Sequence, residues 1–126
     1  MKRFRGLHGW SLIAGLILCL TVSCNAAEPK ISDILASPAQ FDGKTVTVRG
    51  MAAAVKETTS RKGNDYTTFR VQDSGGAPIV IFTFGHLGIR NADCVLVIGV
   101  FEKVKNVGPY TFYDEIEAQR VAPSTC

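Results

Sequence analysis

The chain is poor in the residues that most enzyme sites need. Beyond residue 27 it has a single histidine, His86, no Cys-x-x-Cys pair, and no glycine-rich loop followed by a lysine. Zinc sites use paired histidines or cysteines, and a phosphate-binding loop needs its lysine. A nucleophile-histidine arrangement would have to be built on His86, which lies in a short glycine-rich segment. We therefore expect no enzyme, no metal site and no cofactor.

A net basic charge is also missing once the N-terminus is set aside. Of the 14 Lys and Arg residues, three lie in the first 27 residues, which hold none of the 11 acids, so residues 28–126 carry 11 charges of each sign. This balance excludes a chain-wide basic footprint for nucleic acid. The charges are nevertheless uneven, because residues 44–70 hold six cations and two acids whereas residues 71–126 hold four cations and six acids. Ordinary solvated faces also explain this unevenness.

The first 27 residues are typical of an export signal. Three basic residues at positions 2 to 5 precede an apolar run over 12–20 and small residues over 23–27. We expect residues 1–27 to be a signal peptide or lipoprotein leader, and residues 28–126 to fold in the periplasm or cell envelope. Three outcomes stay open: cleavage after Ala26 or Ala27, lipidation of Cys24 in a segment that resembles a bacterial lipobox, or retention as an anchor helix.

Export also bears on the cysteines. Cys94 and Cys126 remain as an even pair in the exported part, which predicts a disulfide between them. Such a bond would add about 3 to 4 kcal/mol of stability in the chain-entropy model. The alternative is two separate thiols.

Alternating polar and apolar residues predict five strands, over residues 44–55, 66–72, 79–84, 95–104 and 110–118. Gly50 and Gly99 would let the first and fourth strands bend. The polar segment 56–65 predicts a long loop. Residues 31–36 predict a short helix, capped by Ser32 and stopped by Pro38, across one end of the sheet.

The third strand is ambiguous because it is apolar on both faces. Either Ile79 and Ile81 or Phe82 and Phe84 would point outward, unless both rows are buried. Val46 and Val48 of the first strand, by contrast, should share one buried face.

Three stretches, Asp42–Gly50, Tyr66–Asp73 and Asp93–Gly99, resemble the nucleic-acid-binding OB-fold domains of the anticodon-binding type. The resemblance covers about residues 31–121 and implies an all-β fold, a five-stranded Greek-key barrel with a short N-terminal helix. Ligands of that family lie across the second and third strands and the loops that flank them. Exported OB-fold haem chaperones have a tyrosine four residues after their histidine, but Arg90 stands there in this chain, so we expect no haem.

The resemblance implies a ligand-binding surface of cations and aromatic rings. Its candidate residues are Arg49, Arg61, Lys62, Tyr66, Arg70, Phe82, Phe84, Lys103, Lys105 and Tyr110. Aromatic rings stack on bases while Lys and Arg neutralise phosphates. Each residue also has a plain structural role open to it: Tyr66 can cover a neighbouring strand, the two phenylalanines can lie in the core, and Arg70 can pair with Glu115 or Glu117.

The sequence thus predicts an exported, non-enzymatic binding module. We expect it to bind an extended anionic ligand in a groove, with single-stranded nucleic acid as the ligand that the resemblance implies. The alternative is an envelope module that docks a protein partner through a strand edge or its apolar third strand, with no nucleic acid involved.

Overall fold

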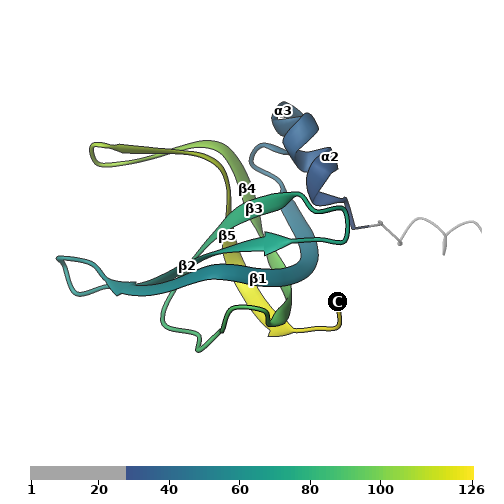
Figure 1. Cartoon of the computed structure of the whole chain (residues 1–126). Helices are drawn as coiled ribbons and strands as arrows, with labels where there is room; N and C mark the ends of the chain where they lie inside the picture. Colours follow the sequence, from purple (N-terminus) through teal and green to yellow (C-terminus); the bar gives the residue numbers. More distant parts are fainter. Residues whose placement is uncertain (1–27) are drawn as a thin grey trace, which may run out of the picture.

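The computed structural model describes residues 28–126, so the predicted leader and Cys24 lie outside the described residues. The described part is mostly β, with two short helices ahead of five strands (Figure 1). The elements are α2 (Ile31–Ala36), α3 (Pro38–Phe41), β1 (Thr45–Thr59), β2 (Asp65–Gln72), β3 (Pro78–Phe84), β4 (Cys94–Val107) and β5 (Tyr110–Pro123). The predicted all-β class and the order of helix and strands are confirmed.

The five strands form one sheet that closes in a ring. They pair in the order β1-β2-β3-β5-β4, and β4 pairs again with β1. All pairs are antiparallel except β3 with β5, which is a short parallel pair over Val80–Phe82 and Glu115–Glu117. This parallel pair brings residues that lie more than thirty positions apart onto one patch of the sheet.

Two glycines let the long strands bend between their neighbours, as predicted. Gly50 precedes Met51, the residue at which β1 passes from pairing with β4 to pairing with β2. A Cβ at Gly50 would lie 2.3 Å from the Gln72 carbonyl oxygen. Gly99 follows a register shift in the pairing of β4 with β5, and a Cβ there would lie 2.3 Å from the Glu117 carbonyl oxygen. Neither position has room for a side chain.

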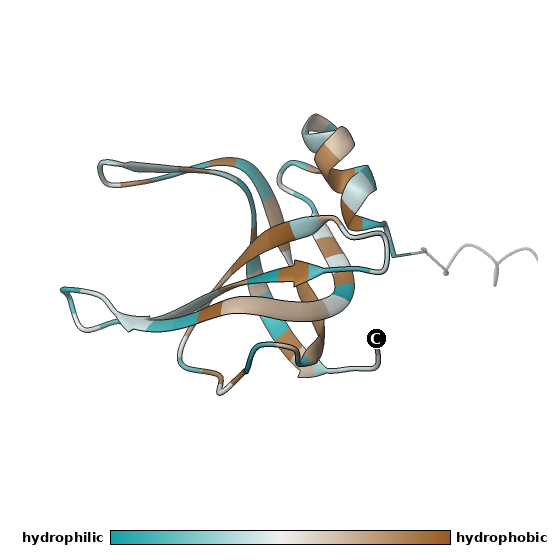
Figure 2. Cartoon of the chain, in the orientation of Figure 1, coloured by the Kyte–Doolittle hydropathy of each residue, from teal (hydrophilic) through white to brown (hydrophobic). Residues whose placement is uncertain are grey.

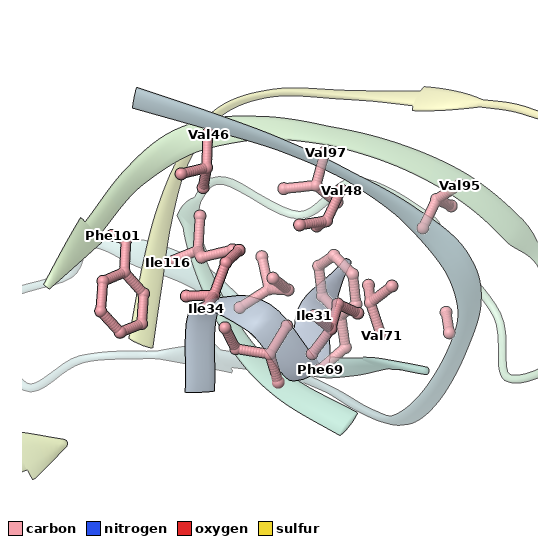
Figure 3. Packing of buried hydrophobic residues seen from close by; sticks show 13 residues of the cluster. Ile31, Ile34, Val46, Val48, Phe69, Val71, Val95, Val97, Phe101 and Ile116 are labelled. Carbon is pink, nitrogen blue, oxygen red and sulfur yellow. The ribbon is translucent and has the colours of Figure 1, made fainter. Parts of the chain in front are cut away.

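The core lies inside the ring and is closed at one end by α2 (Figure 3). Val46 and Val48 are buried, as the alternation predicted, and Ile31 and Ile34 of the helix pack against the same cluster. Figure 2 shows the hydrophobic segments along β3 and on α2. The full set of buried hydrophobic residues is Ile31, Ile34, Val46, Val48, Ala52, Phe69, Val71, Ile79, Ile81, Val95, Val97, Phe101 and Ile116.

The helix differs from the prediction in its ends. Ser32 lies inside α2 and does not cap it; the backbone N–H of Ile31 instead donates to the carboxylate of Asp73, in the turn between β2 and β3, at 3.0 Å. Pro38 ends α2 but also begins α3, because proline at the first position of a helix loses no hydrogen bond.

The strands are also longer than predicted, and the prediction of a long loop over residues 56–65 is wrong. β1 continues to Thr59, and only residues 60–64 form the turn, in which Ser60 and Asn64 hydrogen-bond each other. β4 likewise continues to Val107, beyond the predicted end at residue 104. β5 begins at Tyr110 as predicted but continues to Pro123, beyond the predicted end at residue 118. Two hairpins therefore project toward the same side in Figure 1: the β1–β2 arm, residues 55–68, and the β4–β5 arm, residues 103–114.

Candidate binding face between the two hairpin arms

Alternation along β2 and β3 places a row of aromatic side chains on the outer face of the ring. Ile79 and Ile81 are buried in the core, so Phe82 and Phe84 point outward, and the ambiguity of the third strand is resolved. Tyr66 lies opposite Phe84 in the β2–β3 register. Phe84 keeps 64% of its surface exposed although it is a large apolar residue.

The three rings contact one another. Tyr66 and Phe82 are stacked, with centroids 5.4 Å apart and planes inclined by 27°. Phe82 and Phe84 meet edge to face at 5.1 Å and 88°. The stacked contact covers part of the Tyr66 and Phe82 rings, whereas Phe84 keeps most of its surface exposed. We call Tyr66, Phe82, Phe84 and the neighbouring Lys105 the aromatic face.

Lys105 reaches the aromatic face from the β4–β5 arm. Its ammonium nitrogen lies 4.1 Å from the centroid of the Phe82 ring, which is cation–π geometry. The same nitrogen donates to Glu115 Oε1 at 3.2 Å and to Glu117 Oε1 at 3.0 Å. Glu117 is in register with Phe82 in the parallel pair of β3 and β5, which explains why a carboxylate lies beside this ring.

Burial decides the electrostatics of this ion cluster. The side chain of Glu115 is only 6% exposed, and this burial raises the pKa of its carboxyl group despite the nearby ammonium. Burial also opposes the charge of Lys105, but the hydrogen bonds that it donates to Glu117 and Glu115 and the negative charges of these two acids outweigh burial and raise the pKa of Lys105 above its usual 10.5. Lys105 is therefore charged at neutral pH.

The ion cluster rules out one of the structural roles that the sequence left open. Arg70 could have paired with Glu115 or Glu117, but both glutamates pair with Lys105. Arg70 is exposed on β2 and forms no ion pair within residues 28–126. Glu115 and Glu117 are two positions apart on β5 and so share one face, whereas the parallel register that brings Glu117 beside Phe82 had no signal in the sequence.

The β4–β5 arm presents further apolar side chains on the face that carries Lys105. Phe112 lies opposite Lys105, and Tyr110 lies opposite Val107 two positions along. Tyr110 is 65% exposed. Lys103 is exposed at the root of the arm, where its backbone N–H donates to Asp42. Lys103, Lys105 and Tyr110 thus all belong to this arm, as predicted for the segments that flank the face.

The β1–β2 arm is polar and carries cations. Arg61 and Lys62 are exposed in its turn, and the register places Lys56 opposite Thr68, on the same side as Tyr66. Sequence reasoning did not select Lys56, because the strand pairing that places it beside Thr68 lies in a segment predicted to be unpaired. The face is therefore bordered by cations on the side of β1 and β2, and by aromatic residues and the acid-paired lysine on the side of β4 and β5.

Arg49, which was also a candidate for the binding surface, lies away from the aromatic face and its cations. It lies on the half of β1 that pairs with β4, where its guanidinium contacts Glu28 at 3.0 Å and also Ser124. A shallow hollow beside it is lined by Met51, Gln72 and Cys126 among others, away from the aromatic face. Cys126 forms the predicted disulfide with Cys94, with the two Cα atoms 5.4 Å apart.

His86 contacts the backbone of β1. Its Nε2 lies 3.0 Å from the carbonyl oxygen of Thr58, and the Asp65 carboxylate is 3.8 Å away. Within residues 28–126, no group of three or more His, Cys, Asp or Glu side chains is arranged to hold a metal ion. None of the helices in this part of the chain has the length and apolar character needed to cross a membrane.

The described residues form an aromatic surface that has cations along one border and a buried ion cluster along the opposite border. No protein-family model matches the chain, and no curated protein matches it at a significant level. Its function is therefore argued from this surface.

Proposed function

We propose that this chain is an exported, non-enzymatic binding module with an OB-type barrel. It binds an extended ligand across the aromatic face, between the two arms, and its ligand is single-stranded nucleic acid. The ring of five strands, the glycine bends in β1 and β4 and the helix over one end support the OB-type assignment. The disulfide between Cys94 and Cys126 supports an oxidising compartment.

The observation that carries the proposal is the contact between three outward rings beside a cationic border. Stacking of a base on such a ring contributes about 1 to 3 kcal/mol and tolerates any base, because every base has a π-face. Arg61, Lys62 and Arg70 are exposed and can contact phosphates. A single strand has bases along one edge and phosphates along the other, which matches the arrangement of rings and cations here.

A protein partner is the second candidate, favoured by a specific feature of the β4–β5 arm. This two-stranded arm exposes large apolar side chains on both of its faces, namely Val104, Val107, Tyr110, Phe112 and Tyr113. Exposed apolar patches of this kind often mark interaction surfaces. Binding of a protein there would depend on Tyr110 and Phe112 and would be insensitive to loss of Arg61 and Lys62.

Titration of a fluorescent single-stranded oligonucleotide, followed by anisotropy, tests the first candidate. Phosphate contacts make affinity fall steeply as salt rises, and we expect R61A/K62A to weaken binding about 3- to 10-fold and to flatten the salt dependence. Y66A should weaken binding by removing a stacking platform. K44A/R49A removes two cations at the other end of β1, namely Lys44 just before the strand and Arg49 in the half that pairs with β4. It serves as the matched control and should bind as the unaltered protein does. Undetectable binding in dilute salt contradicts the proposal.

A further inference from the structure

The strand edges of the β1–β2 arm are covered by other parts of the chain. On one side, β2 pairs with β3 over Tyr66–Gln72. On the other side, the connection between β3 and β4 lies against the outer edge of β1. The backbone N–H of Val55 donates to Asn91 Oδ1 at 2.9 Å, and His86 Nε2 lies 3.0 Å from the Thr58 carbonyl oxygen. Both strands of this arm therefore have neighbours along their outer edges.

The β4–β5 arm has no such cover within residues 28–126. Its outer segments, Val104–Val107 and Tyr110–Tyr113, pair only with each other. β3 joins β5 only at Glu115–Glu117, and the Lys103 N–H, which donates to Asp42 Oδ1, lies at the root of the arm. The arm therefore has an unpaired strand edge on each side. Unpaired backbone N–H and C=O groups of such an edge can pair with a strand of another chain.

The usual protection of a free edge is also missing from this arm. Exposed strand edges are commonly guarded by charged side chains or proline. Between residues 104 and 113 the only charged residue is Lys105, whose ammonium group is held by Glu115 and Glu117. Pro109 lies in the turn, outside both strands. Strand pairing by another chain is therefore not opposed at the outer edge of β5.

The side chains of the arm favour contact along an edge over contact with one face. Phe112 lies opposite Lys105 and Tyr113 lies opposite Val104, so these two aromatic residues point to opposite faces of the arm. Tyr113 is 68% exposed and Phe112 is 42% exposed. A partner that docked flat on the arm would cover only one of them. A strand that pairs along the edge of β5 contacts side chains on both faces.

We propose that the outer edge of β5, residues 110–113, pairs antiparallel with the same edge of a second copy of this chain. The edge carries no charge and residues 28–126 hold 11 charges of each sign, so two copies do not repel each other. A twofold register centred on Thr111 places Tyr110 of each copy opposite Phe112 of the other, an aromatic cross-strand pair formed twice. This pairing is independent of the ligand proposed above.

The dimer should be weak, because four paired residues from each copy bury less than the roughly 1,200 Å² of a stable interface. Sedimentation velocity of the purified protein, without nucleic acid, tests it. We expect the weight-average mass to rise from one chain toward two between about 5 and 200 μM, the range of a small transient interface.

Y110K places a lysine on the proposed edge, and symmetry introduces it twice into each dimer. We expect Y110K to raise the dissociation constant of the dimer about tenfold or more, because it removes both aromatic pairs and adds like charges. N64K is the matched control, since it adds one lysine to the exposed turn of the other arm and should leave the dissociation constant unchanged. Tyr110 is exposed, so Y110K should unfold at the same temperature as the unaltered protein.

Hydrogen exchange shows which edge pairs. The amides of residues 110–113 should exchange more slowly at high than at low protein concentration, while those of residues 104–107 stay unchanged. A mass of one chain at about 200 μM overturns the proposal, as does a dimer that Y110K leaves as tight as before. Protection confined to residues 104–107 overturns the assignment to β5.

Discussion

At the scale of single residues, the ion cluster of Lys105, Glu115 and Glu117 has two acids and one base. Lys105 is the only cation that contacts the buried Glu115 within the described residues. Burial already raises the pKa of Glu115, so without the lysine its carboxylate would be strongly disfavoured at neutral pH. The stability of this part of the sheet therefore depends on one side chain of the β4–β5 arm.

We expect K105M to lower the free energy of unfolding by about 2 kcal/mol at pH 7, less than for a fully buried pair because Glu117 is partly exposed. An acid whose pKa is raised by folding favours the folded state most at pH values below its unfolded pKa, and this contribution is lost as pH rises through the folded pKa. The deficit of K105M should therefore shrink as the pH falls from 7 toward 4.5. Urea unfolding at several pH values measures it.

The double variant K105M/E115Q is the control for this prediction. It removes the buried charge together with its partner, so its stability should exceed that of K105M at pH 7 and should vary less with pH. A deficit of K105M that stays constant from pH 7 to 4.5 would show that lost packing on Phe82, and not the unpaired carboxylate, is responsible.

Single residues also show how far the sequence could predict the candidate site. Alternation together with the resemblance selected Tyr66, Phe82 and Lys105, and the structure brings these three together. Period-two patterns are local, so they report which face a side chain shares with its neighbours. They cannot report that Glu117 lies beside Phe82, because that contact depends on a parallel pairing between distant strands. Arg49 was selected for its charge alone and lies elsewhere.

At the scale of elements, the bends of β1 and β4 decide whether the sheet can close. Gly50 and Gly99 lie where a neighbouring strand approaches so closely that a Cβ would meet a backbone carbonyl oxygen. Backbone atoms cannot move aside as the end of a flexible side chain can, so a methyl group there must push two strands apart.

We expect G50A and G99A each to lower the free energy of unfolding by about 2 to 3 kcal/mol, the usual cost of overpacking a dense interior. G75A is the matched control, because Gly75 lies in the β2–β3 turn, where a Cβ would meet only the end of the Asp73 side chain at 3.3 Å. Thermal unfolding followed by circular dichroism measures all three. If G50A is as stable as G75A, the close approach at Gly50 does not constrain the fold.

The ends of elements were harder to predict than their existence. The segment 56–65 was predicted to be a loop because it is polar, yet Thr58 and Thr59 extend β1 and pair with Tyr66 and Asp65. A two-stranded arm is solvated on both faces, so it lacks the apolar residues that mark a strand packed on a core. β4 was also predicted to end too early, at residue 104 instead of Val107, because apolar and polar residues do not alternate regularly in the β4–β5 arm.

At the scale of the whole molecule, the disulfide ties the C-terminal end to the start of β4 across 32 positions. Cys126 is exposed, so a reductant can reach the bond.

We expect reduction to lower the free energy of unfolding by about 3 to 4 kcal/mol without changing the fold. Denaturant unfolding with and without dithiothreitol measures this. C94A/C126A should have the free energy of unfolding of the reduced protein, and dithiothreitol should not change it. If dithiothreitol lowers the stability of this variant as much as that of the unaltered protein, the loss does not come from the disulfide.

Both ends of the described chain meet at Arg49, which contacts Glu28 and Ser124. Figure 1 places residue 28 and the C-terminal end on one side of the molecule and the tips of both arms on the other. If the chain before residue 28 is a membrane tether, through lipidation of Cys24 or a retained anchor helix, it joins the domain on the side away from the arm tips. In that arrangement the space between the two arms, where we propose that the ligand binds, would open toward the surrounding fluid and not toward the lipid surface.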